Sequence, residues 1–172
     1  MEQVLGRASL RRNMLVTFPT HILVHEVGTQ QGDVLARLGR DGWFRVFLGK
    51  GRKVELPDGT EWRIAAVGAG PYIEPVVTSK TGKLAIASPF GRRSYRLNGR
   101  DYAYNLYPSN VSGARKRIWS LREYERDIAT FGPSSLVADY PVPLAAALLC
   151  FTLIQHGVPG EAHLGIPEFR WA

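Results

Sequence analysis

Cysteine is almost absent from this 172-residue chain, in which Cys150 is the only one. A single cysteine excludes an internal disulfide and fits a reducing compartment. Cys150 lies within an apolar segment, and no cationic residue stands beside it in the sequence to activate its thiol. We therefore expect Cys150 to be a small buried core residue rather than a reactive group.

The chain also lacks an apolar run long enough to span a membrane. Its most apolar segment, residues 143–155 (PLAAALLCFTLIQ), would extend only about 20 Å as a helix, at ~1.5 Å per residue. A bilayer core of about 30 Å requires around 20 apolar residues. Residues 136–144 are fairly apolar as well, which keeps a membrane helix as the alternative, but Asp139 and two prolines interrupt them.

An export signal is not expected either. Ser9-Leu10-Arg11-Arg12 faintly matches a twin-arginine signal, and the apolar residues 14–24 follow it. Pro19 and His21 interrupt that run, and no small-residue cleavage site comes after it. We therefore expect a cytoplasmic protein.

Residue patterns typical of an active site or a metal site are missing. His21 and His25 have the spacing of metal ligands on a helix, but residues 16–27 look strand-like and offer no matching cysteine or carboxylate. Residues 68–71 (GAGP) lack the strand–loop–helix context of a phosphate loop, and Ser88 has no partnered base. We predict no catalytic residue, no metal and no cofactor. The alternative is an enzyme whose site is built from residues on distant strands.

The apolar segment is predicted to be a helix without a polar face. Leu, Ala and Phe dominate it, Pro143 stands where a first-turn proline loses no hydrogen bond, and Gly157 supplies a stop. A helix that is apolar on every side must be surrounded by protein or lipid. Because the segment is too short to span a bilayer, we expect a central, buried helix at about residues 143–156.

Most of the preceding chain is predicted to form antiparallel hairpins. Between residues 43 and 107, short runs of aromatic and branched residues alternate with turn signals such as Pro57-Asp58-Gly59 and Asn98-Gly99. Period-two alternation places Trp62 and Ile64 on one face, opposite Arg63. This pattern indicates a half-solvated antiparallel sheet. The absence of βαβ alternation favours a meander or barrel over a parallel fold.

The charged stretch from residue 115 to 131 (RKRIWSLREYERDIATF) is compatible with two structures. An amphipathic helix would use Leu121, Tyr124, Ile128 and Phe131 as its apolar face. We favour two strands, around residues 118–121 and 128–131, followed by a turn into a short third strand at 136–138. No repeat or linker divides the chain. We predict one mainly β domain over residues 5–165 and a C-terminal tail at 166–172.

Hairpins that finish in an entirely apolar helix resemble the tubby-like superfamily, which includes tubby C-terminal domains, plant LURP-one-related proteins and phospholipid scramblases. The resemblance covers about residues 43–157 and rests on the hairpin spacing, on WSLREYERDIATF (119–131) and on PLAAALLCFTLIQHG (143–157). It implies a closed antiparallel β-barrel wrapped around a C-terminal hydrophobic helix. Such a helix fills an apolar barrel and leaves no sheet edge exposed. The first forty residues are outside this resemblance.

Positive charge is concentrated in one region. The formal net charge is +7, and residues 92–117 alone contribute +6. The basic residues there are Arg92, Arg93, Arg96, Arg100, Arg115, Lys116 and Arg117. These basic residues can be interpreted as ordinary solvated surface charges. The functional interpretation is a cluster near strand ends that holds anions through paired guanidinium donors.

The leading functional hypothesis is a non-enzymatic binding or scaffold domain. The resemblance implies phosphoinositide binding in some members, so anionic phospholipid head groups are the first candidate partner, at a membrane periphery. Nucleic acid is the second, because tyrosines 95, 102, 104 and 107 accompany the basic residues. A barrel that binds a small ligand in an internal cavity is the competing class.

Overall fold

Neighbouring strands of the sequence are neighbours in space throughout this fold. The computed structural model describes residues 3–17, 20–39, 51–68, 74–91, 94–109 and 118–156. The strands in these ranges are β1 (Gln3–Thr17), β2 (Thr20–Thr29), β3 (Val34–Leu38), β4 (Arg52–Glu55), β5 (Glu61–Val67), β6 (Glu74–Ser79), β7 (Gly82–Gly91), β8 (Ser94–Gly99), β9 (Ala103–Ser109), β10 (Ile118–Glu123), β11 (Arg126–Phe131) and β12 (Ser135–Pro143). One helix, α2 (Leu144–His156), follows β12 within the same ranges.

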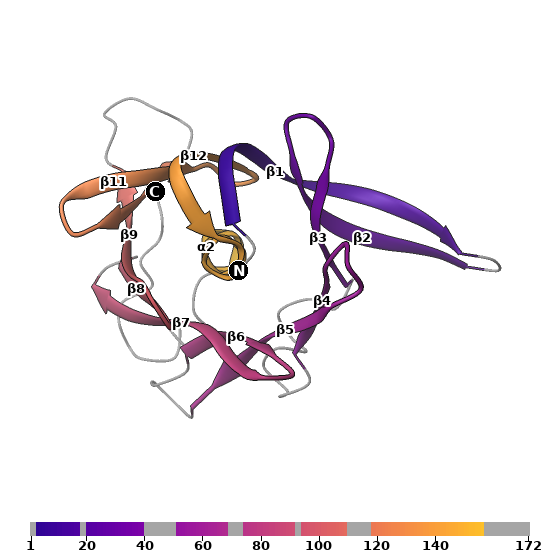
Figure 1. The fold of residues 1–172 in the computed structure, drawn as a ribbon, viewed down its shortest axis with the longest axis horizontal. Helices are drawn as coiled ribbons and strands as arrows, with labels where there is room; N and C mark the ends of the chain where they lie inside the picture. The colour runs from indigo at the N-terminus through magenta and orange to yellow at the C-terminus, as the bar shows by residue number, and fades with distance from the viewer. Residues whose placement is uncertain are drawn as a thin grey trace.

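The strands form a closed barrel (Figure 1). Each strand pairs antiparallel with the next, and β1 pairs with both β2 and β12 to close the ring. The predicted fold class, a closed antiparallel β-barrel around an apolar helix, is confirmed. The first forty residues, which the resemblance left aside, supply β1 to β3 and so close the wall. Closure removes the unpaired edges that an open sheet of this size would expose.

Alternation along the strands separates the barrel interior from the surface. In β5, Trp62 and Ile64 are buried while Arg63 between them is exposed, as the sequence pattern predicts. In β9, Tyr104 and Leu106 are buried and Ala103 is exposed. Because successive side chains in a strand point to opposite faces, each strand gives one row of apolar side chains to a shared core.

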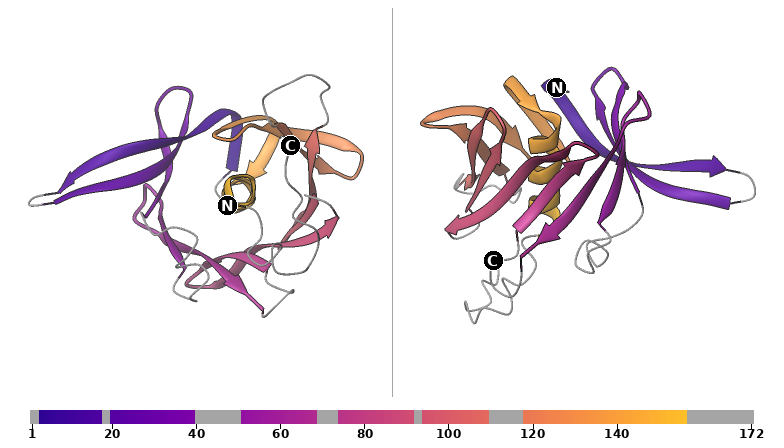
Figure 2. Two further views of the ribbon diagram at one scale, coloured as in Figure 1. Left: turned by 180° about the vertical axis from the view of Figure 1, so that it is seen from behind. Right: turned by 60° about the horizontal axis from the view of Figure 1, so that its bottom comes forward.

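The helix α2 occupies the interior of the barrel (Figures 1 and 2). It contacts β1 and β12 on one side and β6 and β7 across the ring. Every residue from Leu144 to Leu153 is buried, and Thr152 satisfies its hydroxyl by donating to the carbonyl of Leu148 at 2.8 Å. Phe151 meets Phe131 of β11 edge to face, with ring centroids 5.4 Å apart. The uniform apolarity of the segment therefore reflects a surrounding wall of protein. Within the described ranges, no helix has the length and apolar character of a membrane span.

The stretch from 118 to 131 forms two strands, β10 and β11, which confirms the favoured interpretation over the helix. The strand after Gly132-Pro133 is longer than predicted, since β12 continues to Pro143. Its alternation breaks after Ala138, and the register with β1 shifts there, where Val4 and Gly6 face Val142 and Ala138. An irregular pairing of this kind accommodates proline inside a strand.

The Asn98-Gly99 turn prediction is wrong by two residues. Asn98 pairs with Ala103 inside the β8–β9 ladder, and the turn residues are Arg100 and Asp101. The Gly99 N–H donates to the carbonyl of Tyr102 at 3.0 Å. A Cβ added at Gly99 would overlap the Tyr102 ring. Glycine is needed here to let an aromatic ring lie against the backbone, not to supply a positive φ.

Candidate functional site

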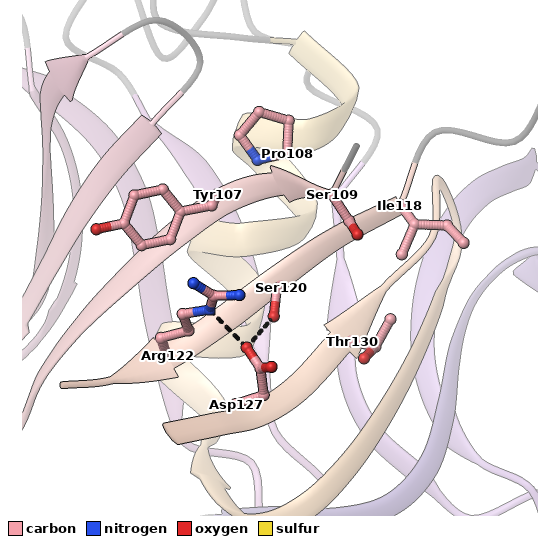
Figure 3. Close-up of a pocket in the computed structure, with 8 residues that line it drawn as sticks. All are labelled: Tyr107, Pro108, Ser109, Ile118, Ser120, Arg122, Asp127 and Thr130. Carbon is pink, nitrogen blue, oxygen red and sulfur yellow. Dashed lines mark hydrogen bonds and ion pairs between the residues drawn. The ribbon is translucent and has the colours of Figure 1, made fainter. Parts of the chain in front are cut away.

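A hollow lies on the outer face of the barrel over β9, β10 and β11 (Figure 3). Its volume is about 410 Å³. The lining residues are Tyr107, Pro108, Ser109, Ile118, Ser120, Arg122, Asp127 and Thr130. Ser109 is the last residue of β9 and Ile118 the first of β10, whereas Arg122 and Asp127 lie near the β10–β11 turn, so the lining follows most of the length of β10.

A bulge in β11 brings the charged residues of this hollow together. Leu121 pairs with Ala129, but the next residue of β10, Arg122, pairs with Asp127, so Ile128 is an extra residue in β11. Both Ile128 and Ala129 are buried, which breaks the period-two alternation. The shift places Asp127 on the outer face beside Arg122. Bulges commonly re-aim side chains in this way.

Asp127 is held by two donors. The Ser120 hydroxyl donates to Asp127 Oδ1 at 2.5 Å, and Arg122 Nε donates to the same oxygen at 2.6 Å (Figure 3). These contacts stabilise the charged carboxylate, so the pKa of Asp127 is lowered, first by the Ser120 hydrogen bond and then by Arg122. A carboxylate with a lowered pKa is a weaker base than an ordinary aspartate. The arrangement therefore suits binding better than proton abstraction.

The Arg122 guanidinium is fixed on two sides. Its central carbon lies 5.6 Å from the centroid of the Tyr107 ring, while its Nε is engaged by Asp127. The two terminal nitrogens point away from Asp127 (Figure 3). No hydrogen bond to these terminal nitrogens is present within the part of the chain that the structure describes. Arg122 thus offers two oriented N–H₂ donors next to the hollow, the geometry that recognises a phosphate or carboxylate group.

Aromatic rings and cations alternate from β10 back to β7. The Tyr107 ring meets Phe90 edge to face at 5.5 Å, and the Arg96 guanidinium lies 5.5 Å from the centroid of Phe90. Phe90 is 44% exposed although it is a large apolar side chain. Asn105 stands in register between Arg96 and Arg122, and its Oδ1 is buried without a hydrogen-bond partner in the described structure. This outer face therefore combines two guanidinium groups with an acceptor-bearing amide between them.

The predicted basic cluster is only partly described. Arg92, Arg93, Arg115, Lys116 and Arg117 lie outside the described residues. The other two, Arg96 and Arg100, are both exposed but are not brought together. Arg96 lies within β8, whereas Arg100 is at the turn four residues further on, about 13 Å along an extended strand. Had the turn been at Asn98-Gly99 as predicted, Arg96 and Arg100 would have flanked it; because the turn is at Arg100 and Asp101, they do not.

Arg122 and Asp127 were not predicted from the sequence, and Tyr107 was named only as one of the tyrosines that accompany the basic residues. The available signal was the run from Leu121 to Phe131, in which Ile128 and Ala129 are consecutive apolar residues in a strand that otherwise alternates. A bulge at that pair predicts Asp127 outside the barrel, opposite Arg122 in the hairpin. Without the bulge, Asp127 would face the core.

The histidines and the cysteine form no second site in the described part of the chain. His21 and His25 both belong to β2. Among the described residues, no three His, Cys, Asp or Glu side chains gather as a metal site. Cys150 is fully buried, and its desolvation raises the pKa of the thiol. A buried, protonated thiol is a structural residue rather than a nucleophile.

Comparison of the chain with protein-family models, with curated proteins and with solved structures yields no match in any of the three. The tubby-like resemblance consequently stays a prediction, and the site has to be interpreted from its own geometry.

Proposed function

We propose that this chain is a non-enzymatic binding or scaffold domain that holds phosphate groups, such as those of anionic phospholipid head groups, in the hollow over β9 to β11. The observation that carries the proposal is the Arg122 guanidinium. It is anchored by Asp127 and Tyr107 and presents its terminal nitrogens beside a space large enough for a phosphate-bearing group. Oriented guanidinium donors bind phosphate more strongly than solvated lysines do.

Arg122 and Asp127 together contribute no net charge, so the attraction for an anion requires further basic residues. The sequence contains such residues beside strand ends of this face. Gly91 and Ser94 pair at the end of the β7–β8 hairpin, with Arg92 and Arg93 as the two residues between them. Likewise Arg115, Lys116 and Arg117 immediately precede Ile118, which lines the hollow. The described ends of these two hairpins belong to the same end of the barrel.

The filled interior supports an external site over the competing class. A barrel that binds a small ligand inside needs a cavity between its walls. Here the buried face of each strand packs with the side chains of α2, including Leu148 and Leu149, in one core. The outer hollow is therefore the better candidate for ligand binding. A cytoplasmic location at the membrane periphery is part of the same proposal.

Co-sedimentation with vesicles tests this function. Wild-type protein should bind vesicles of phosphatidylcholine mixed with phosphatidylinositol phosphate and should not bind pure phosphatidylcholine. Binding should weaken as salt rises, since each Lys or Arg near an anionic surface contributes about 1 kcal/mol and is screened within a Debye length. Arg122→Gln should lose most of the binding while Arg100→Ser, at the β8–β9 turn and not in the lining of the hollow, retains it.

Three results would count against the proposal. Equal binding by Arg122→Gln and wild type would remove the hollow as the site. Equal loss in Arg122→Gln and Arg100→Ser would show a diffuse charge effect with no defined site. Stronger binding to single-stranded nucleic acid than to the anionic vesicles, at the same salt, would favour the nucleic-acid alternative.

A further inference from the structure

Strands β1 and β2 extend beyond the barrel wall as a two-stranded arm (Figures 1 and 2). Among the described residues, β1 pairs with β12 through residues 3–9, and β2 pairs with β3 from His25 onward. In between, residues 11–17 of β1 pair with residues 20–26 of β2. The arm, defined as residues 11–17 and 20–24, has no other strand partner among the described residues.

An arm of two strands is a weak structure by itself. An isolated hairpin is marginally stable in water, and three or more strands are normally needed. Each outer edge of the arm also leaves a row of backbone N–H and C=O groups without a strand partner in the described structure. Such a row is a template for pairing with another chain.

The two edges of the arm differ in their residue types. The β1 edge contains Arg11 and Arg12, and charged residues on an edge oppose pairing. The β2 edge, Thr20-His21-Ile22-Leu23-Val24, contains no Lys, Arg, Asp, Glu, Pro or Gly. Its composition is that of an interior strand, with β-branched residues at three of five positions. The devices that protect sheet edges are therefore present on one side of the arm and missing on the other.

We propose that the β2 edge of the arm pairs with the same edge of a second copy of this chain. The stretch Thr20–Val24, whose outer edge has no strand partner among the described residues, can pair antiparallel with its own copy about Ile22. This register places Ile22 opposite Ile22, His21 opposite Leu23 and Thr20 opposite Val24. The result is a four-stranded sheet in the order β1, β2, β2, β1, with a closed two-fold interface. Each chain carries +7, so association through an edge without Lys or Arg avoids opposing like charges.

Disulfide trapping tests the register. At the two-fold axis the Cα atoms of paired residues lie about 4.5–5.5 Å apart, within the range that a disulfide bridges. Ile22→Cys should therefore form a disulfide-linked dimer under mild oxidation with copper phenanthroline. Leu15→Cys is the matched control, because Leu15 pairs with Ile22 in the same arm but lies on the β1 edge. Buried Cys150 is common to both variants. Equal or greater crosslinking of Leu15→Cys would overturn the proposal.

Sedimentation equilibrium of the full chain gives an independent readout. Wild type should dimerise, and Ile22→Lys should weaken the dimer at least tenfold because two like charges would face each other at the axis. Leu15→Lys should leave the dimer within about twofold of wild type. A monomeric wild-type chain at all concentrations, or a dimer unaffected by Ile22→Lys, would refute the arm interface. If the chain is monomeric and Ile22→Lys instead reduces vesicle binding, the occupant of the edge is lipid and not a second copy.

Discussion

Arg122 and Asp127 face each other on the outside of the barrel because Ile128 is an additional residue in β11. The carboxylate accepts from Arg122 Nε at 2.6 Å and leaves the terminal guanidinium nitrogens to the adjacent hollow. A single local irregularity thus converts a regular hairpin into a site with an oriented cation.

Ser120 should control the ionisation of Asp127. Its hydroxyl is the first cause of the lowered pKa, so Ser120→Ala should raise the pKa of Asp127 toward its ordinary value. A titration followed by carbon NMR of the carboxyl group measures this. Asp58, whose pKa is lowered by Thr60, serves as an internal control and should not change. The lowered pKa of Asp127 stabilises the folded state fully at pH values above the pKa of the unfolded state. In wild type this stabilisation should be lost as the pH falls through the folded pKa of Asp127. An unchanged pKa of Asp127 in the variant would refute the assignment.

A charge inside α2 should unfold the domain. Leu149 is fully buried against the barrel wall, so Leu149→Asp places an unpaired carboxylate in an apolar core. The cost of several kcal/mol is a large part of a total stability of about 5–15 kcal/mol. Tyr124→Asp is the control, since Tyr124 is 90% exposed at the β10–β11 turn. Urea unfolding should show little or no folded Leu149→Asp and a near-wild-type Tyr124→Asp. A folded, soluble Leu149→Asp would contradict the central position of the helix.

Stability should decline at alkaline pH through Cys150. Burial raises the pKa of this thiol above its ordinary value of 9.0. Above pH 9.0 the unfolded state releases the thiol proton while the folded state keeps it. The contribution of Cys150 to the free energy of unfolding is therefore complete below pH 9.0 and decreases as the pH rises toward the folded pKa. Between pH 9 and 10 the free energy of unfolding should fall more steeply in wild type than in Cys150→Ala. The largest difference between the two slopes is about 1.4 kcal/mol per pH unit. Identical slopes would show that the thiol is not protected.

Gly99 and Tyr102 should behave as a coupled pair. A methyl group at Gly99 would overlap the Tyr102 ring, so Gly99→Ala should cost about 1–3 kcal/mol. In a Tyr102→Ala background the same change should be nearly neutral, because the obstructing ring is gone. A double-mutant cycle measured by denaturant unfolding provides the coupling energy. Additive effects of the two substitutions would indicate that Gly99 matters for its backbone alone.

Sequence patterns predicted the architecture because the strands of the barrel and its central helix produce strong patterns of apolar residues in the sequence. Alternation in β5 identified its buried face, and a helix such as α2, without any polar side, can be explained only by an apolar surrounding. These signals depend on each segment's own residues. They do not require knowledge of which strand is adjacent.

The candidate site was not predictable in the same way. It depends on a one-residue bulge at Ile128 and on contacts between strands, such as Arg122 with Tyr107, that local alternation does not encode. The turn after Asn98 was misplaced for a similar reason: the glycine signal reflects packing by Tyr102 and not the turn itself. Counting charge located a basic region but could not show that Arg96 lies within β8 whereas Arg100 is at the turn after it.

The most direct test of the central claim is an NMR titration of the chain with inorganic phosphate, followed at the Arg122 Nε–H and at the backbone amides of Tyr107 and Ser109. We predict saturable shifts of all three in wild type. In Arg122→Gln, the shifts at Tyr107 and Ser109 should be lost although the spectrum remains that of a folded protein. Shifts that are absent from the hollow in wild type, or that persist unchanged in Arg122→Gln, would contradict an anion site built on Arg122.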